Sequence, residues 1–192
     1  MSTPAHAAAD HAGEPPGTSG AARLDRFNAR PEPEALDGLL ACCAAAAWAR
    51  RVAAGRPYRY LDDVLAASDD AVTTMTDADL ADALAGHPRI GERRPEPGGP
   101  GSRAASWSSQ EQAGMRDAGQ QASEEMAGLN QAYEDRFGHI YLVCATGRSA
   151  AELAGLLRAR LGNDPRAERG VVRAELAQIN RLRLARLLAE DA

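Results

Sequence analysis

Hydrophobic residues recur at intervals of three and four along most of the chain, with polar and charged residues between them. This spacing places the apolar side chains on one face of an α-helix, so it predicts helices rather than strands. Caps and glycines divide the pattern, as Thr76 and Gly86 do on either side of one helical run. About seven helices are expected, within residues 31–55, 56–68, 76–86, 108–115, 123–138, 149–162 and 164–190.

The run IYLVCA, residues 140–145, differs from the rest of the chain. It is apolar and rich in β-branched and aromatic residues, which favours an extended strand. A single strand cannot form a sheet, so the run predicts one extended segment buried among helices. The expected fold class is therefore all-α: a single-domain helical bundle with one buried extended segment.

The first 21 residues are small, polar and rich in proline. They lack the apolar side chains that would offset the entropy cost of ordering the chain. This composition predicts a disordered N-terminal tail over residues 1–21 and a helical domain over residues 22–192. The first core residues are expected at Leu24 and Phe27.

The composition, 44% hydrophobic and 26% charged, is typical of a globular protein. A net charge of −5 and the lack of a basic stripe interleaved with aromatics argue against a nucleic-acid partner. No apolar run is long enough to cross a bilayer, and the N-terminus has no secretory signal pattern, so no membrane partner and a cytoplasmic location are expected. The cysteines at 42, 43 and 144 have neither CxxC nor CxxH spacing, which predicts small core residues in a reducing compartment.

A P-loop, a GxGxxG fingerprint, a metal-ligand cluster and a GxSxG elbow are all missing from the sequence. Nucleotide-binding, metal-dependent and serine-hydrolase functions therefore have no support, and no metal is expected. Candidate chemistry lies instead at a histidine, a polar pentapeptide and an arginine far apart in the sequence.

The histidine is His87, in the stretch GHPRIGE that follows a predicted helix. The dipole of that helix would favour a protonated imidazole at its C-terminal end. Pro88 biases His87 toward an extended backbone and stiffens its position. His87 is therefore either a surface residue after a helix or an acid–base group that titrates near neutral pH.

The pentapeptide is SSQEQ, residues 108–112, where Ser108 and Glu111 match the capping-box pattern of a helix start. Glu111 is therefore either a cap or a functional carboxylate, and Gln112 has no evident structural role. The arginine is Arg183, which falls within the apolar stripe of the last predicted helix, whereas Arg181 points to the opposite side. A buried guanidinium needs an anionic or carbonyl partner, either an internal ion pair or a bound carboxylate.

Five segments together resemble the 2-oxo-4-hydroxy-4-carboxy-5-ureidoimidazoline (OHCU) decarboxylase family, in the family's order and spacing. The resemblance covers about residues 24–188. Its segments are LACCAAAAWARRVAAGRPY, HPRIGE, SSQEQAGM, LNQAYEDRFGHIYLVCATGRS and LGNDPRAERGVVRAELAQINRLRL.

The resemblance implies an all-helical homodimer that uses no cofactor and converts a small carboxylate, OHCU, to (S)-allantoin in urate degradation. It implies His87 and Glu111 as catalytic residues, with Arg183 holding the substrate carboxylate. Which of the two catalytic residues moves which proton stays open. The other substrate-binding residues that it implies are Pro88, Ser108, Ser109, Gln110, Gln112, Tyr141, Leu142, Val143, Cys144 and Ala145.

The sequence departs from the family after the RFG motif, where His139 and Ile140 replace the common phenylalanine and proline. This leaves open a second interpretation, the same fold and site acting on a different small carboxylate in secondary metabolism. A third is a non-catalytic helical binding or dimerisation module. Such a module predicts loss of the set formed by His87, Glu111 and Arg183, yet all three are present.

Overall fold

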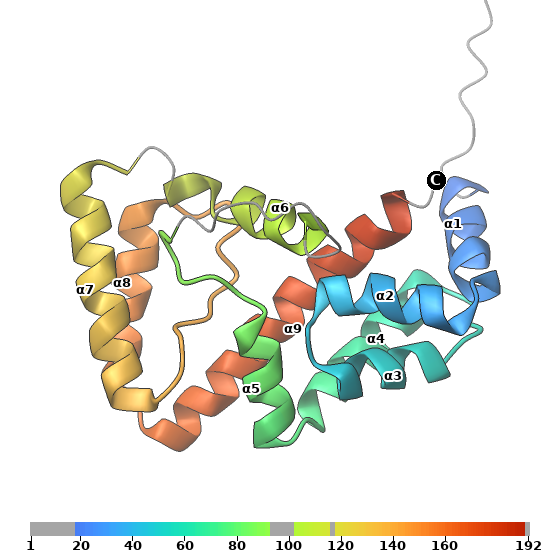
Figure 1. The fold of residues 1–192 in the computed structure, drawn as a ribbon, viewed down its shortest axis with the longest axis horizontal. Helices are drawn as coiled ribbons and strands as arrows, with labels where there is room; N and C mark the ends of the chain where they lie inside the picture. The colour runs from blue at the N-terminus through green and yellow to red at the C-terminus, as the bar shows by residue number, and fades with distance from the viewer. Residues whose placement is uncertain (1–17, 93–101, 116–117, 191–192) are drawn as a thin grey trace, which may run out of the picture.

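The computed structural model describes residues 18–92, 102–115 and 118–190, and Figure 1 shows how their helices are arranged. Within these ranges the chain forms nine α-helices, one short 3-10 helix and no β-strand, which confirms the all-α class with two more helices than expected. The elements are α1 (Thr18–Ala29), α2 (Glu32–Cys42), α3 (Ala46–Ala54), α4 (Leu61–Thr73), α5 (Asp77–Ala85), α6 (Ser102–Glu111), η1 (Ala113–Met115), α7 (Gln120–Phe137), α8 (Ala150–Arg160) and α9 (Pro165–Glu190).

One additional helix is α1, which begins four residues before the expected domain boundary. Residues 1–17, for which a disordered tail was predicted, lie outside the described residues, and residues 18–21 belong to α1. As predicted, Leu24 and Phe27 are the first core residues, and both are buried. Their apolar side chains attach α1 to the rest of the bundle.

The other additional helix arises because the run over residues 31–55 is broken into α2 and α3. Cys43 has an extended backbone (φ −147°, ψ 123°), although the alanines after it favour a helix. In a continuous helix the Cys42 carbonyl would bond to the amide four residues later. Here it accepts a hydrogen bond from Nη1 of Arg183 at 3.2 Å, so a tertiary contact overrides local propensity.

Helix α5 begins and ends as the sequence predicts. Thr76 caps it through a reciprocal pair of bonds with Asp79, and Gly86 follows its last residue. A Cβ on Gly86 would lie 2.7 Å from the Cβ of Ala44, so glycine permits the end of α5 to touch the α2–α3 break. His87 therefore starts its loop next to this break.

The capping-box prediction for SSQEQ was wrong. Helix α6 starts at Ser102, and the pentapeptide begins in its last turn, where the amide of Gln112 still bonds to the carbonyl of Ser108 at 3.1 Å. The Ser108 hydroxyl accepts from Arg183 instead of capping a helix start. No helix was expected between the ones predicted at 76–86 and 108–115, yet α6 already begins at Ser102; residues 93–101 lie outside the described residues.

Two hydrophobic clusters form the core, and α9 crosses the molecule between the helices that supply them (Figure 1). The first cluster is built mainly by α1 to α5 with α9, around Trp48, Leu39 and Leu176. The second lies around α7 and α8, which pack side by side at one end of the molecule, and includes Met126 and Leu157.

The extended segment Tyr141 to Ala145 joins the two clusters. It is buried throughout and forms no strand, as the sequence predicted. Successive side chains of an extended chain point to opposite sides. Accordingly, Leu142 and Cys144 pack in the first cluster, and Tyr141, Val143 and Ala145 pack in the second.

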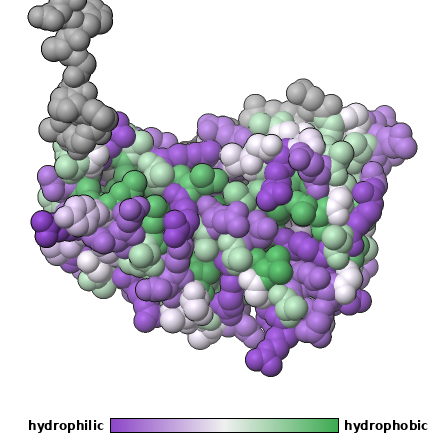
Figure 2. All heavy atoms as spheres, turned by 180° about the vertical axis from the view of Figure 1, so that it is seen from behind, coloured by the Kyte–Doolittle hydropathy of each residue, from purple (hydrophilic) through white to green (hydrophobic). Residues whose placement is uncertain are grey.

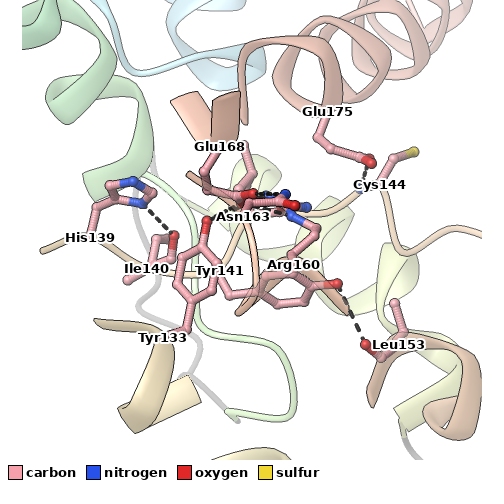
Figure 3. A network of polar contacts seen from close by, with 11 residues as sticks. Tyr133, His139, Ile140, Tyr141, Cys144, Leu153, Arg160, Asn163, Glu168 and Glu175 are labelled. Carbon is pink, nitrogen blue, oxygen red and sulfur yellow. Dashed lines mark hydrogen bonds and ion pairs between the residues drawn. The ribbon is translucent and has the colours of Figure 1, made fainter. Parts of the chain in front are cut away.

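A buried polar network fixes this segment from the side of α7, α8 and α9 (Figure 3). Arg160 donates from Nε to Glu168 at 2.7 Å and from Nη1 to the Leu142 carbonyl at 2.8 Å. The Tyr133 hydroxyl also donates to Glu168, which is completely buried. The guanidinium of Arg160 lies 4.8 Å from the centre of the Tyr141 ring, a cation–π contact. The network therefore holds the extended segment by both its backbone and a side chain.

On the face opposite to that of Figure 1, patches of hydrophobic residues are broken up by hydrophilic ones (Figure 2). The large hydrophobic side chains that remain exposed among the described residues are Leu40, Tyr60, Leu61 and Leu182. No helix in the described ranges is long and apolar enough to cross a membrane.

Candidate active site

Arg183 lies on the buried stripe of α9, as predicted, and is 1% exposed. Its guanidinium donates two hydrogen bonds to the carboxylate of Glu111, from Nε to Oε1 at 2.9 Å and from Nη2 to Oε2 at 2.7 Å. Nη2 also donates to the Ser108 hydroxyl at 2.9 Å, and Nη1 donates to the Cys42 carbonyl at 3.2 Å. Arg183 thus ties α9 to α6 and to the α2–α3 break, and the internal ion pair left open by the sequence is present.

A second arginine of α9 reaches the same carboxylate from the half-exposed side. Nη1 of Arg186 lies 3.5 Å from Oε1 of Glu111. Arg181 points away, as predicted, and pairs with Asp69 of α4 at the surface. Two cations therefore lie against one carboxylate.

His87 is buried, not a surface residue after a helix. Its Nδ1 lies 2.9 Å from the carbonyl oxygen of Ala83, which can only accept, so Nδ1 carries the proton and Nε2 has a free lone pair. Nε2 is buried and has no hydrogen-bond partner among the described residues. The ring is therefore oriented by α5, and its basic nitrogen is left for another group.

The predicted protonated imidazole was wrong. Burial, followed by the charge of Arg183, lowers the pKa of His87 to about 4, and the bond to the Ala83 carbonyl offsets this only partly. The helix dipole acts in the same direction as that carbonyl, but desolvation is the larger effect for a group this deeply buried. His87 is neutral at physiological pH.

The loop after His87 is fixed by three side chains from other elements. Gln112 accepts from the amide of Gly91 at 2.9 Å and donates to the Arg89 carbonyl at 3.3 Å. Asn130 of α7 donates to the Ile90 carbonyl at 2.9 Å. Arg89 itself forms a two-point ion pair with Glu134 of α7. Gln112 thus has the structural role that the sequence did not reveal, and it supports the loop carrying His87.

The remaining candidates fall into two groups. Pro88 is half-buried beside His87, whereas Ser109 and Gln110 are exposed, and Gln110 lines a hollow with Arg186 and Glu190 of α9. Within the extended segment, the Cys144 amide donates to Glu175 of α9 at 2.8 Å, and the Leu142 carbonyl already accepts from Arg160. The structure therefore brings together His87, Ser108, Glu111 and Arg183, but not Ser109 and Gln110.

Sequence reasoning missed several residues of this region: Cys42, Glu175, Asn180 and Arg186. Only Asn180 had a readable signal, an amide within the apolar part of the last helix. The cysteines are free and buried, as predicted, and burial raises the pKa of the Cys43 thiol to about 11. They are neutral thiols. No group of three or more potential metal ligands occurs in the described part of the chain.

The depressed pKa of His87 predicts a pH dependence of stability. Between pH 6.5 and about 4 the unfolded chain binds a proton that the folded chain does not, so stability falls as pH falls through this window. We expect His87 to remove about 2 kcal/mol of unfolding free energy between pH 7 and pH 5. Urea unfolding of the wild type and a His87→Asn variant at both pH values isolates this contribution. Equal losses in the two proteins would contradict it.

The fold and the site define a small helical protein with a buried, neutral histidine next to an arginine–carboxylate pair. Residues 28–185 match the family model for OHCU decarboxylase, and the chain belongs to the OHCU decarboxylase family. The resemblance seen in the sequence is thereby confirmed.

Relatives and a solved structure agree with this membership. The chain is 33% identical over 143 residues to the 2-oxo-4-hydroxy-4-carboxy-5-ureidoimidazoline decarboxylase of Amia calva, covering 73% of this chain and 77% of that protein. It is 28% identical over 151 residues to the uric acid degradation bifunctional protein TTL of Arabidopsis thaliana, covering 79% of this chain. The match spans only 46% of that longer relative. A crystal structure of OHCU decarboxylase in the presence of (S)-allantoin superposes with a TM-score of 0.65 at 27% identity, covering 80% of this chain and 98% of that one.

Proposed function

We propose that the chain is a carboxy-lyase that converts OHCU to (S)-allantoin and carbon dioxide during urate degradation. Family membership and the names of the relatives support this activity. One observation supports this assignment of the site. Arg183 is buried and has one N–H without an acceptor, and it lies near the buried Nε2 of His87, which has no hydrogen-bond partner in the described chain.

The donor count of Arg183 leaves room for a substrate carboxylate. A guanidinium has five N–H donors, and four of them are engaged by Glu111, Ser108 and the Cys42 carbonyl. The fifth is on Nη1. Because Glu111 holds the guanidinium by two bonds, that donor is fixed in direction, and Glu111 acts as the positioning residue for it.

His87 is suited to accept a proton. It is neutral, its tautomer is set by the Ala83 carbonyl, and Nε2 is the free basic nitrogen. An anionic substrate bound at Arg183 would counter the charge that lowers the histidine's pKa, and would so raise its basicity when it is needed.

The reaction then follows from the substrate's own bonds. When the C–C bond to the carboxylate breaks, its electron pair moves toward the adjacent C=N, whose nitrogen takes a proton from solvent. The product is an enol, so the substrate supplies its own electron sink and we expect no cofactor. Nε2 of His87 takes the hydroxyl proton as the C=O forms and returns it to the neighbouring carbon, on one face, to give the S product.

The family also implies backbone contacts from the extended segment, Tyr141 to Ala145, and contacts from Pro88 and Ser108. The buried position of that segment and its anchoring by Arg160 and Glu175 support such a role. Gln112 contributes by supporting the His87 loop. We do not include Ser109 and Gln110 in the substrate contacts, because both side chains are exposed, unlike the buried set formed by Ser108, Glu111 and Arg183.

Assembly and location complete the proposal. The family resemblance favours a homodimer, and Leu40 of α2 and Leu182 of α9 are exposed hydrophobic side chains that such a contact would cover. We keep the cytoplasmic location that the sequence led us to expect. Light scattering of the purified chain measures its mass in solution directly, and a monomer at all concentrations would remove the dimer from the proposal.

The activity is tested by adding purified protein to freshly generated OHCU and following allantoin by circular dichroism. The expected result is rapid formation of the S enantiomer at a rate proportional to protein concentration. Racemic product at the spontaneous rate would show that OHCU is not the substrate. In that case other small carboxylates with an adjacent C=N are the compounds to assay next.

A further inference from the structure

Asn180 of α9 is completely buried, yet neither polar atom of its side chain has a hydrogen-bond partner among the described residues. Among the other buried side chains of the described residues, none has both an amide nitrogen and an amide oxygen without a hydrogen-bond partner. A buried amide without partners costs roughly 1–3 kcal/mol for each unpaired group. A native protein rarely retains such a group without a role for it.

The position of Asn180 indicates what that role is. It precedes Arg183 by three residues, so the two side chains lie on neighbouring positions of one helix face. Asn180 lies beside the Cys43 thiol, where a weak side-chain hydrogen bond from its amide lowers the pKa of that thiol, as does the charge of Arg183. The contact is outside normal hydrogen-bond geometry, and sulfur is too weak an acceptor to satisfy the amide. The end of α5, from which His87 follows, touches the same break at Ala44. Asn180, Arg183 and His87 therefore converge at the α2–α3 break.

The molecule itself shows which partner an asparagine amide selects. Asn28 of α1 donates from Nδ2 to the carbonyl of Tyr58 at 2.7 Å and accepts from the amide of the same residue at 2.9 Å. A carboxamide can therefore bind an N–H and a C=O of one group at the same time, by accepting one hydrogen bond and donating another. The proposed substrate presents such an edge in its ureido group and another in its ring amide.

We propose that Asn180 is a substrate-binding residue that recognises an amide-type N–H and C=O edge of the ligand, beside the carboxylate bound by Arg183. The inference rests on the proposed function and specifies which part of the substrate this residue binds. Arginine alone would accept any small carboxylate, whereas the amide pair restricts the site to ureides and related cyclic amides. A ligand without that edge leaves a buried amide unpaired, which is a strong basis for rejection.

The test replaces Asn180 by leucine, which has a similar volume, and by alanine, which leaves space. (S)-Allantoin is the binding probe, because it carries the amide edges without the carboxylate, and OHCU is the kinetic substrate. We expect both variants to bind (S)-allantoin at least about tenfold more weakly, the loss expected for two hydrogen bonds. KM for OHCU should rise more than kcat falls. The urea midpoint of Asn180→Leu should equal or exceed that of the wild type, since no internal bond is lost.

Asn28→Leu is the matched control, because its amide is fully paired inside the protein. It should lower the urea midpoint and leave affinity for (S)-allantoin unchanged. Wild-type affinity in both Asn180 variants would overturn the proposal. So would a lowered midpoint or failure to fold in both, which would show that the amide has an internal role. If either of these results is found while the wild type turns over OHCU, the role of Asn180 is wrong but the decarboxylase assignment stands. If the wild type neither binds (S)-allantoin nor turns over OHCU, both the role of Asn180 and the decarboxylase assignment are wrong.

Discussion

His87→Asn is expected to lower turnover by about a hundredfold or more, the usual loss for a positioned acid–base group. Asparagine keeps one hydrogen-bonding edge close to the Ala83 carbonyl, but it has no basic nitrogen where Nε2 now lies. The variant should fold and should still bind (S)-allantoin, because the amide contact proposed for that ligand is made by Asn180 of α9. Steady-state rates, circular dichroism and allantoin binding check the three expectations together.

The pH profile gives this prediction a second readout. Since the pKa of His87 in the free protein is about 4, kcat/KM of the wild type should rise with pH through that value and should show no ionisation of His87 near neutrality. The variant should lack the acidic step. A His87→Asn protein within a few-fold of wild-type rate would mean that the imidazole only packs against α5, and that the proton moves elsewhere.

Arg183→Met is expected to cost about 3–5 kcal/mol of unfolding free energy, because it leaves the Glu111 carboxylate buried without its main partner. Activity should fall below detection at temperatures where the variant is still folded, since the donor for the substrate carboxylate is gone. Urea unfolding and turnover at low temperature measure the two effects. Arg181→Met, on the exposed side of the same helix, is the control and should cost less than about 1 kcal/mol.

The double variant Arg183→Met, Glu111→Gln separates folding from function. Removing both charges removes the uncompensated carboxylate, so much of the lost stability should return. Activity should not return, because the guanidinium that would donate to the substrate carboxylate is still missing. Recovery of activity together with stability would show that the pair serves the fold alone.

The sequence predicted the elements whose signals are local. Apolar spacing located the helices after residue 55 except α6, with a cap at Thr76 and a glycine stop at Gly138, whose φ of +74° only glycine adopts readily. The apolar stripe of α9 was sufficient to predict that Arg183 is buried, and the apolar run at 140–145 was sufficient to predict an extended core segment.

What the sequence could not supply were contacts between distant segments. Alanines around residue 45 favour a continuous helix, and only the approach of Arg183 and Gly86 from far along the chain explains the break. Ser108 and Glu111 are three residues apart, a separation that fits both a capping box at a helix start and any i, i+3 pair inside a helix. Their position at the end of α6 could therefore not be predicted from the sequence. The pKa of His87 depends on burial by the whole fold.

The alternation of the extended segment between two clusters also restricts how the chain can vary in length. Inserting or deleting one residue between Tyr141 and Ala145 would exchange the sides to which the following side chains point, so that residues shaped for one cluster would enter the other. Neither cluster could absorb such an exchange by small adjustments, because both are close-packed. In a library of single-residue insertions and deletions, we therefore expect no surviving clones with a change in this segment.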